Sequence, residues 1–291
     1  MEASGPAFTI PQQDAFIPTI KIIGAGGGGG NVVSKMADEG IQHVDLIACN
    51  TDLKALNSSN ATIKMELGRE LTRGLGAGAR PEIGAHAAEE SATEIEQMLN
   101  GADMAFIVAG MGGGTGTGSA PVIARISKSK KILTVGVVTL PFSFEGKRRM
   151  RAALEGVATL RENTDTLLVI PNERLLEATD RSTSFKDAFH MVDEVLVHAI
   201  QGITDLLNGV GDINVDFADM QTVMEGMGRA VIGKGTGVGK DRMFRAIDSA
   251  IHSPLMQDTD IQGAKGILIH LVAPRDAGAL EITAAMNQLE D

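Results

Sequence analysis

The sequence predicts an α/β protein in which a long central helix joins a doubly wound, mostly parallel sheet to a smaller α+β domain. Three observations lead to this prediction. Short apolar runs alternate with helical segments over residues 19–180, and each run is continuously apolar, as is typical of parallel strands covered on both faces. Glycine clusters follow two of these runs. A long amphipathic stretch then begins at Ser184.

Five runs rich in Ile, Val and Leu are predicted to be the strands of the sheet. They are residues 19–23, 44–49, 104–109, 132–138 and 166–170. Between them, helical periodicity predicts a helix over 31–39, one long helix over 81–100 and a helix that starts at 120–124.

Residues 184–207 are predicted to form the central helix. Ser184 is a suitable N-cap, with Asp187 three residues on, and apolar side chains recur along one face. A helix of this length is about 36 Å long. After it, we expect helices near 218–225, near 241–252 and from Leu280, and strands near 230–232 and 266–272.

The composition excludes several classes of protein. A net charge of −11 argues against a nucleic-acid groove, which needs a concentrated basic face. The single cysteine, Cys49, cannot form an internal disulfide and is predicted to be a buried apolar residue. No apolar run approaches the roughly 18 residues of a membrane span, and no basic segment precedes Lys21. We therefore expect a cytoplasmic protein without direct membrane insertion.

Glycine is concentrated at two places. The windows 24–30 and 110–118 hold 12 of the 35 glycines. In the second window, closely spaced glycines between a strand and a helix let backbone N–H groups converge at the positive end of the helix dipole. Thr115 and Thr117 add two hydroxyl donors. This pattern predicts a phosphate-binding loop.

The first window allows two interpretations. Gly24, Gly26 and Gly29 satisfy G-x-G-x-x-G, and Asp45 follows about twenty residues on, which suits a dinucleotide such as NAD. However, two phosphate loops on neighbouring strand ends can hold a triphosphate from both sides. We therefore favour a nucleoside triphosphate and keep a dinucleotide oxidoreductase as the alternative.

Two more glycine-rich segments lead to different predictions. Residues 72–82 are either a flexible connector or, beside two phosphate loops, a sensor of the γ-phosphate. Residues 235–240 resemble a Walker loop, but Lys234 replaces its first glycine and Asp241 replaces the Ser or Thr that binds Mg²⁺. We expect a strand-to-helix turn there.

Asp216 and Asp219 have the i,i+3 spacing that places two carboxylates on one side of a helix's first turn. Helix capping explains this position, and catalysis also explains it. The residues alone leave both interpretations open.

Taken together, six segments resemble the tubulin/FtsZ family of GTPases, and in particular its bacterial cell-division branch. They are 24–31, 50–52, 74–81, 112–118, 141–146 and 214–219, and the similarity runs from Thr19 to the last residue. The resemblance implies a flexible arm over 1–18, a GTP-binding domain over 19–183, the central helix over 184–207 and a C-terminal α+β domain over 208–291. It also implies GTP/GDP and Mg²⁺ as ligands.

The resemblance further implies roles for individual residues. Glu145 would accept hydrogen bonds from the ribose, Asn172 and Asp193 would read guanine, and Phe189 would pack on the base. Asn214, Asp216 and Asp219 would form the catalytic loop, while no protein ligand of the metal is predicted. The full set of nucleotide-contacting residues implied is Gly27, Gly28, Gly29, Gly30, Asn31, Asn50, Asp52, Gly78, Ala79, Gly113, Gly114, Thr115, Gly116, Thr117, Gly118, Pro141, Glu145, Arg149, Asn172, Phe189 and Asp193.

The length of the central helix separates the predicted nucleotide site from the aspartates, so these must act on the nucleotide of a neighbouring molecule. A head-to-tail contact that does not close produces a filament. The resemblance thus implies a homopolymer at the division site. The alternative is a non-hydrolysing filament scaffold for shape or plasmid partition. Family members continue beyond the point where this chain ends, so we expect a truncated chain that lacks the tail that binds division adaptors.

Overall fold

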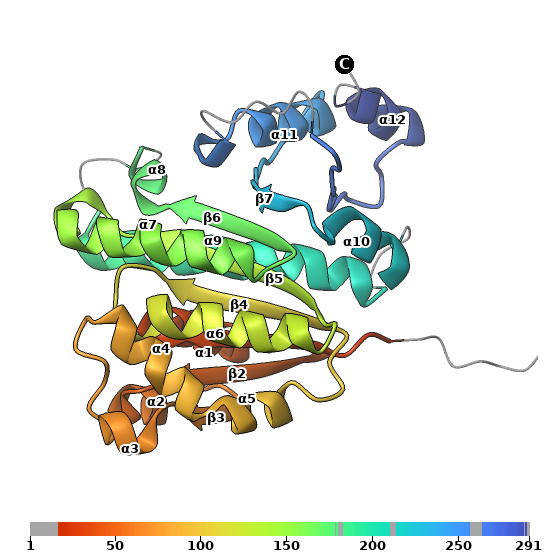
Figure 1. Cartoon of the computed structure of the whole chain (residues 1–291). Coiled ribbons are helices and arrows are strands. Elements are labelled where there is room, and N and C mark those ends of the chain that lie inside the picture. Colours follow the sequence, from red (N-terminus) through yellow and green to blue (C-terminus); the bar gives the residue numbers. More distant parts are fainter. Residues whose placement is uncertain are drawn as a thin grey trace, which may run out of the picture.

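A computed structural model describes residues 17–177, 179, 183–209, 214–256, 264–287 and 289. Its centre is a seven-stranded, fully parallel sheet in the order β3-β2-β1-β4-β5-β6-β7 (Figure 1). All but the last two residues of the predicted N-terminal arm lie outside the described residues. The strands are β1 Ile20–Ala25, β2 Val44–Asn50, β3 Ile63–Glu66, β4 Met104–Gly110, β5 Leu133–Leu140, β6 Thr166–Pro171 and β7 Gly228–Ala230.

Helices connect the strands and continue beyond them. They are α1 Gly26–Asp38, α2 Leu53–Ser58, α3 Arg69–Thr72, α4 Pro81–Glu90, α5 Ala92–Met98, α6 Thr115–Ser129, α7 Lys147–Glu162, α8 Asn172–Leu176, α9 Phe185–Leu207, α10 Phe217–Met224, α11 Arg242–Ile251 and α12 Ala279–Asn287. Two short 3₁₀ turns span Ser143–Glu145 and Pro254–Met256.

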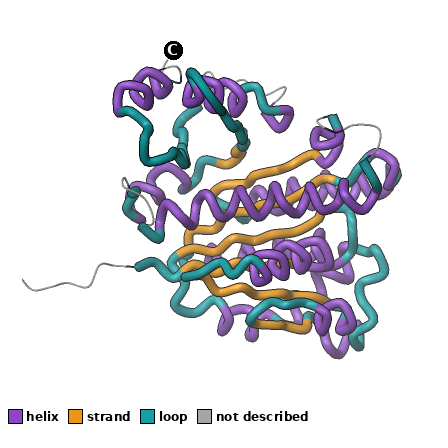
Figure 2. Tube along the Cα trace, turned by 180° about the vertical axis from the view of Figure 1, so that it is seen from behind, coloured by secondary structure: helices purple, strands orange, loops and turns teal. Residues whose placement is uncertain are grey.

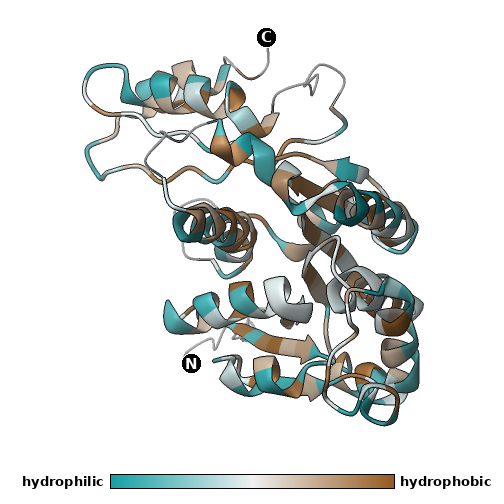
Figure 3. Cartoon of the chain, turned by 90° about the vertical axis from the view of Figure 1, so that its left-hand side faces the viewer, coloured by the Kyte–Doolittle hydropathy of each residue, from teal (hydrophilic) through white to brown (hydrophobic). Residues whose placement is uncertain are grey.

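The sheet has a separate apolar core on each face, because neighbouring strand residues point to opposite sides. Ile22 and Phe106 pack with α1 and α9 on one face. Ile23 and Ile107 pack with α4, α5, α6 and α7 on the other. Figure 2 shows α9 crossing the first face, and Figure 3 shows the most hydrophobic residues gathered on the strands inside the molecule. This arrangement confirms the predicted doubly wound sheet.

The central helix is confirmed as α9. Ser184 caps it, with its Oγ accepting a hydrogen bond from the Asp187 backbone N–H at 3.1 Å and donating to the Asp187 carboxylate at 2.6 Å. At 1.5 Å per residue, its 23 residues span about 35 Å. Cys49 is fully buried on β2, and burial raises the pKa of its thiol to about 12.

Most of the first glycine cluster lies inside a helix, and the second cluster ends in one, which the sequence did not indicate. We expected helices from residues 31 and 120, but α1 begins at Gly26 and α6 at Thr115. Glycine, threonine and Pro121 are poor residues for a helix interior, so their propensities placed both starts too late. β1 runs directly into α1, whereas residues 111–114 separate β4 from α6.

Three other predicted elements differ from the structure. The helix over 81–100 is divided at Ser91, whose buried hydroxyl accepts a hydrogen bond from the Gly68 N–H at 3.0 Å. The strand expected at 230–232 is β7, and it pairs with β6 in the main sheet. Residues 266–272 are described but do not form a regular strand. The short edge strand β3 was not predicted, because its residues are exposed or half-buried.

The C-terminal segments form a small third core. Met243 and Ile247 of α11 pack with Ala285 of α12, which bears out the two helices expected there. The Walker-like segment lies against α11, where a Cβ on Gly235 would overlap the carbonyl oxygen of Ala246 and one on Gly237 that of Arg242. These glycines therefore allow an extended chain to approach a helix backbone, and the segment is structural.

The close crossing of α4 and α6 leads to a prediction about the free energy of unfolding. A Cβ on Gly118 would overlap the Pro81 carbonyl oxygen and lie 2.5 Å from the Ala85 nitrogen, so Gly118→Ala forces the helices apart. We expect a loss of about 1–3 kcal/mol in the free energy of unfolding. The matched control is Gly30→Ala, also in a helix but with nothing within 4 Å, which should gain about 0.5–1 kcal/mol. Thermal unfolding of the nucleotide-free variants measures both changes, and equal midpoints would contradict this packing.

Candidate nucleotide site

The candidate site lies at the carboxyl edge of the sheet, where the chain order reverses. β1 pairs with β2 on one side and with β4 on the other, and Ala25 is opposite both Cys49 and Ala109. The segments that follow these three strands therefore meet at one point. Open α/β sheets bind ligands at such a switch point, outside the carboxyl ends of the strands.

Two helix N-termini meet at this point. Neither α1 nor α6 has a side-chain cap, so the first N–H groups of both helices are available to a ligand. The two loops are in close contact: a Cβ on Gly26 would lie 2.6 Å from the Gly116 nitrogen, and one on Gly28 would lie 3.2 Å from the Gly110 nitrogen. Two positive dipole ends at one place form an anion-binding site.

The glycines of the two loops have different structural roles. Gly27, Gly30 and Gly113 have nothing within 4 Å of an added Cβ and face open space. By contrast, a Cβ on Gly29 would overlap the Val108 carbonyl oxygen, and Gly118 packs on α4 as described above. The open positions allow a ligand to approach the backbone, and the packed positions bring the backbone segments together.

Threonine side chains join the loops. Thr51 Oγ1 lies 2.6 Å from Thr115 Oγ1, and this hydrogen bond connects the end of β2 to the start of α6. The Thr117 hydroxyl accepts a hydrogen bond from the Gly112 N–H at 2.9 Å and is buried, so it holds the loop together, and its contact with a phosphate stays a prediction. Thr51 was not predicted as a site residue, although a fully buried polar residue at a strand's carboxyl end is a usable signal.

Asn50 and Asp52 organise the neighbouring turn. Asn50 Oδ1 accepts a hydrogen bond from the Asp52 N–H at 3.1 Å. Asp52 Oδ1 accepts from the backbone N–H groups of Lys54 at 2.9 Å and Ala55 at 3.1 Å, so Asp52 is the N-cap of α2. Both residues lie beside the phosphate loops, and the contacts described for their side chains are structural.

The third glycine-rich loop lies directly against the second phosphate loop. A Cβ on Gly114 would be 2.8 Å from Ala77 Cβ and 3.2 Å from the Ala79 nitrogen. Ala79 has a φ of 56°, a left-handed conformation that is strained for a residue with a Cβ, and Gly78 next to it has a φ of 59°. The loop therefore has the location that a sensor of the terminal phosphate requires.

Glu145 and Arg149 flank the site after β5, which ends just before Pro141. Glu145 Oε1 accepts a hydrogen bond from the Phe142 N–H at 2.8 Å, and its Oε2 pairs with Arg149 Nη1 at 2.7 Å. The backbone of Arg149 in turn lies against Gly112 of the phosphate loop. Glu145 is thus held in place, with lone pairs remaining for a ligand's hydroxyl groups.

The remaining predicted residues lie on α8 and α9. Asn172 is buried, and its Oδ1 has no hydrogen-bond partner among the described residues. Such an atom costs about 1–3 kcal/mol, which a bound donor recovers. Asp193 is half-buried, and burial raises the pKa of its carboxyl to about 6, against the lowering effect of Lys35 and His190. An amide and a carboxylate suit a base that presents N–H donors.

Phenylalanine side chains surround this end of the site. Phe189 packs edge-on against Phe142, with ring centroids 5.1 Å apart. Phe144 and Phe185 complete a closed group of four rings and are more than half exposed. Of these four, only Phe189 was predicted as a site residue. Phe142 and Phe144 lie in segment 141–146, which the sequence analysis singled out without giving either ring a role, and Phe185 carries no further sequence signal.

Asp216 and Asp219 lie at the opposite end of the molecule. In Figure 1 the arrowheads of β4 and β6 point toward the α8 end, whereas α10 lies at the other end. Asp216 accepts a hydrogen bond from the Asp219 N–H at 2.8 Å and is the N-cap of α10. This confirms the helix-capping role that the sequence allowed. Both residues are exposed, and Asn214 shortly precedes them.

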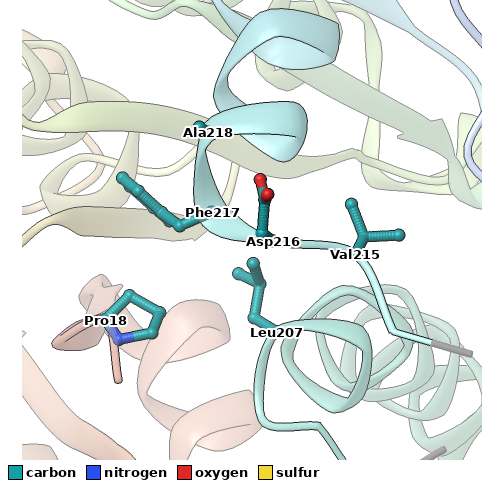
Figure 4. Close-up of a pocket in the computed structure, with 6 residues that line it drawn as sticks. All are labelled: Pro18, Leu207, Val215, Asp216, Phe217 and Ala218. Carbon is teal, nitrogen blue, oxygen red and sulfur yellow. The ribbon is translucent and has the colours of Figure 1, made fainter. Parts of the chain in front are cut away.

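A hollow of about 410 Å³ borders these residues, lined mainly by Pro18, Leu207, Val215 and Phe217 (Figure 4). Figure 4 shows the Asp216 carboxylate pointing away from Leu207, the last residue of α9. The structure therefore does not bring the catalytic candidates to the phosphate loops of the same chain. It brings the other predicted residues to one edge of the sheet.

The fold and this edge define an α/β nucleotide-binding protein with two facing phosphate loops. The model of the tubulin/FtsZ family GTPase domain matches residues 19–180, and that of the FtsZ family C-terminal domain matches residues 228–291. The chain belongs to the tubulin/FtsZ family, and it is a polymerising, cytoskeletal GTPase that binds GTP and GDP.

Solved structures of other proteins have the same fold. The chain is 46% identical to FtsZ from M. jannaschii, described as an empty dimer, with a TM-score of 0.90 over 95% of this chain and 80% of that one. It is 25% identical to CetZ1 from Haloferax volcanii, a GDP-bound monomer, with a TM-score of 0.69 over 80% and 73% of the two chains. CetZ2 from the same organism, a GTPγS-bound protofilament, is 25% identical, with a TM-score of 0.67 over 79% and 70%.

The buried Asn172 oxygen leads to a prediction that distinguishes an effect on nucleotide binding from an effect on the stability of the fold. Asn172→Ala removes a buried oxygen that has no hydrogen-bond partner among the described residues, so the midpoint of thermal unfolding without ligand should change little. The rise in that midpoint on adding GDP should shrink, because about 1–3 kcal/mol of binding free energy is lost. Asn163→Ala, which removes a C-cap side chain that donates a hydrogen bond to the Thr159 carbonyl oxygen of α7 at 2.8 Å, serves as the control. An unchanged response to GDP would remove Asn172 from the site.

Proposed function

We propose that this chain hydrolyses GTP in a site that is complete only when the α10 end of one molecule covers the phosphate loops of the next. The separation of the two sets of residues carries this proposal. A helix about 35 Å long lies between them, so no rearrangement of one folded chain brings Asp216 or Asp219 to its own phosphate loops.

The carboxylates close to the phosphate loops cannot take the catalytic role proposed for Asp216 and Asp219. Asp52 is committed to capping α2, and Glu145 is committed to the Phe142 N–H and to Arg149. Asp216 and Asp219, in contrast, are exposed on the outer surface of the molecule. A head-to-tail contact of this kind does not close on itself, so repeating it builds a filament.

In this site the N–H groups of α1 and α6 hold the phosphates, and Glu145 accepts from the ribose hydroxyls. Asn172 and Asp193 read the guanine edge, with Phe189 packed on the ring. The carboxylate of Asp219 from the next molecule orients a water and takes its proton as the oxygen attacks the γ-phosphorus. The bond to the β–γ bridging oxygen breaks, and that oxygen leaves with its electron pair on GDP.

Mg²⁺ would suit this site as a counter-ion of the phosphate oxygens, because it is a hard cation that prefers oxygen ligands and keeps several of its waters. When bound, it neutralises part of the phosphate charge. The protein's share of the chemistry is then to place the water and the phosphates, which is most of what phosphoryl transfer needs.

The third loop supports a role for hydrolysis in disassembly. Ala77, Ala79 and Arg80 of this loop lie against Gly114 of the second phosphate loop, where a terminal phosphate that is lost on hydrolysis would be bound. We therefore propose that the GDP form has a weaker subunit contact and that the filament forms a division ring in the cytoplasm. A scaffold in which GTP is only structural is the competing function, and it is excluded if GDP accumulates on incubation.

Removing the Asp219 carboxylate tests the shared site. Asp219→Ala should bind GTP and assemble, but its hydrolysis rate should fall by a factor of about 100 or more, as when a positioned acid–base group is lost. Assembly is followed by sedimentation and hydrolysis by phosphate release. Glu94→Ala, an exposed acidic residue in the first turn of α5, is the matched control and should behave like the unmodified chain. Normal turnover by Asp219→Ala would refute its catalytic role.

A further inference from the structure

A single buried threonine connects the second phosphate loop to the third glycine-rich loop. Thr51 follows directly after β2 and is fully buried. Its Oγ1 lies 2.6 Å from the Oγ1 of Thr115, the first residue of α6. Its backbone carbonyl oxygen accepts a hydrogen bond from the Gly76 N–H at 3.0 Å. One residue therefore contacts two of the segments that surround the proposed position of the terminal phosphate.

The burial of Thr51 decides which of the two hydroxyls donates. A hydroxyl has one proton to donate and two lone pairs that accept. Among the described residues, the hydroxyl of Thr51 has Thr115 Oγ1 as its one hydrogen-bond partner. If Thr115 donated, the Thr51 proton would have no acceptor in a place that water does not reach, which is costly. Thr51 is therefore the donor, and Thr115 is the acceptor.

This direction leaves the proton of Thr115 for a ligand. Thr115 is half-buried, and the hydrogen bond to Thr51 is the one that the described residues provide for its hydroxyl. The hydroxyl belongs to the first turn of α6, where no side chain caps the backbone N–H groups. Its proton thus adds one donor to a group of donors at a helix N-terminus, and a phosphate oxygen suits such a group.

The carbonyl of Thr51 holds the third loop beside the same donor. The bond from Gly76 fixes the first part of this loop to the end of β2. Further along the loop, the Ala79 nitrogen is 3.2 Å from the position of a Cβ on Gly114, the residue before Thr115. The Thr115 hydroxyl and the third loop are therefore neighbours in space.

We propose that Thr51 is a positioning residue of the terminal-phosphate site. Its hydroxyl donates to Thr115 Oγ1 and so directs the Thr115 proton to an oxygen of the γ-phosphate, while its carbonyl keeps the third loop next to that oxygen. This inference rests on the proposed function, because it takes the second and third loops as the segments that contact the γ-phosphate.

The simpler explanation is a buried hydrogen bond that only stabilises the fold. Such a bond changes the free energy of unfolding, but it does not distinguish between two ligands that differ by one phosphate group. A positioning role changes the binding of the triphosphate more than the binding of the diphosphate. The ratio of the two affinities therefore separates the explanations.

The test compares the binding of GDP and of a GTP analogue with an imido group between the β- and γ-phosphates. Both compete with a fluorescent guanine nucleotide for the full chain, with saturating Mg²⁺ and at protein concentrations below assembly. Thr51→Val nearly keeps the shape of the side chain and keeps the carbonyl, but it has no proton to donate to Thr115. The ratio of the affinity for the analogue to that for GDP should fall about fivefold, the net value of one hydrogen bond.

Two variants separate positioning from stability. Thr51→Ser keeps the hydroxyl and should have the ratio of the unmodified chain. The matched control is Thr134→Val, because Thr134 is also fully buried and its hydroxyl lies 2.8 Å from both Ser127 Oγ and the Ile132 carbonyl oxygen. Thr134 is near the start of β5, at the opposite edge of the sheet, so its loss should lower stability and leave the ratio unchanged.

An unchanged ratio in Thr51→Val, or an equal fall in Thr134→Val, overturns the proposal. Thr51→Ala removes the same hydroxyl and carries the same expectation if the valine variant does not fold.

Thr115→Val distinguishes failure of this inference from failure of the proposed site. It removes both the acceptor and the proposed phosphate donor, so it should lower the ratio, and Thr51→Val added to it should have no further effect. A further fall means that Thr51 acts by another route and contradicts the proposal. If Thr115→Val lowers the ratio and Thr51→Val does not, only the inference about Thr51 is wrong. If Thr115→Val leaves the ratio unchanged, the γ-phosphate contact of the second loop is misassigned, and the inference about Thr51 is overturned with it.

Discussion

The contact between the N-termini of α1 and α6 is the interaction on which the rest of this structure depends. Two helix ends of the same polarity lie side by side, where Gly26 meets Gly116 and Gly28 meets Gly110. Their free N–H groups and dipoles repel each other in the absence of an anion. The two apolar cores and the Thr51–Thr115 hydrogen bond hold them together, so folding supplies the energy that prepares the site for phosphate.

The same constraint separates binding from hydrolysis. With the carboxyl edge of the sheet occupied by phosphate loops and α9 running the length of the molecule, the exposed carboxylates of α10 lie at the far end. In the proposed scheme, the nucleotide-binding residues and the acidic residues of one chain thus lie at opposite ends of the molecule and do not meet. Asp216 shows that the capping and catalytic interpretations are compatible, because its hydrogen bond to the Asp219 N–H fixes the loop that presents Asp219.

Sequence patterns predicted the doubly wound sheet, α9 and both phosphate loops, because each depends on local periodicity or on glycine spacing. They misplaced the starts of α1 and α6, where strand ends and not propensities determine the helix, and they assigned β7 to a second sheet. The sequence analysis assigned no role to Thr51, Phe144 and Phe185. Their roles come from contacts between segments distant in the chain, which no local pattern contains.

The central claim is that the active site is shared between molecules, and the dependence of hydrolysis on protein concentration tests it most directly. Phosphate release per molecule is measured over a wide range of concentrations at saturating GTP and Mg²⁺. The account predicts almost no turnover at low concentration, where molecules are separate, and a steep rise once assembly begins. A rate per molecule that is the same at every concentration would mean that one chain contains the whole active site.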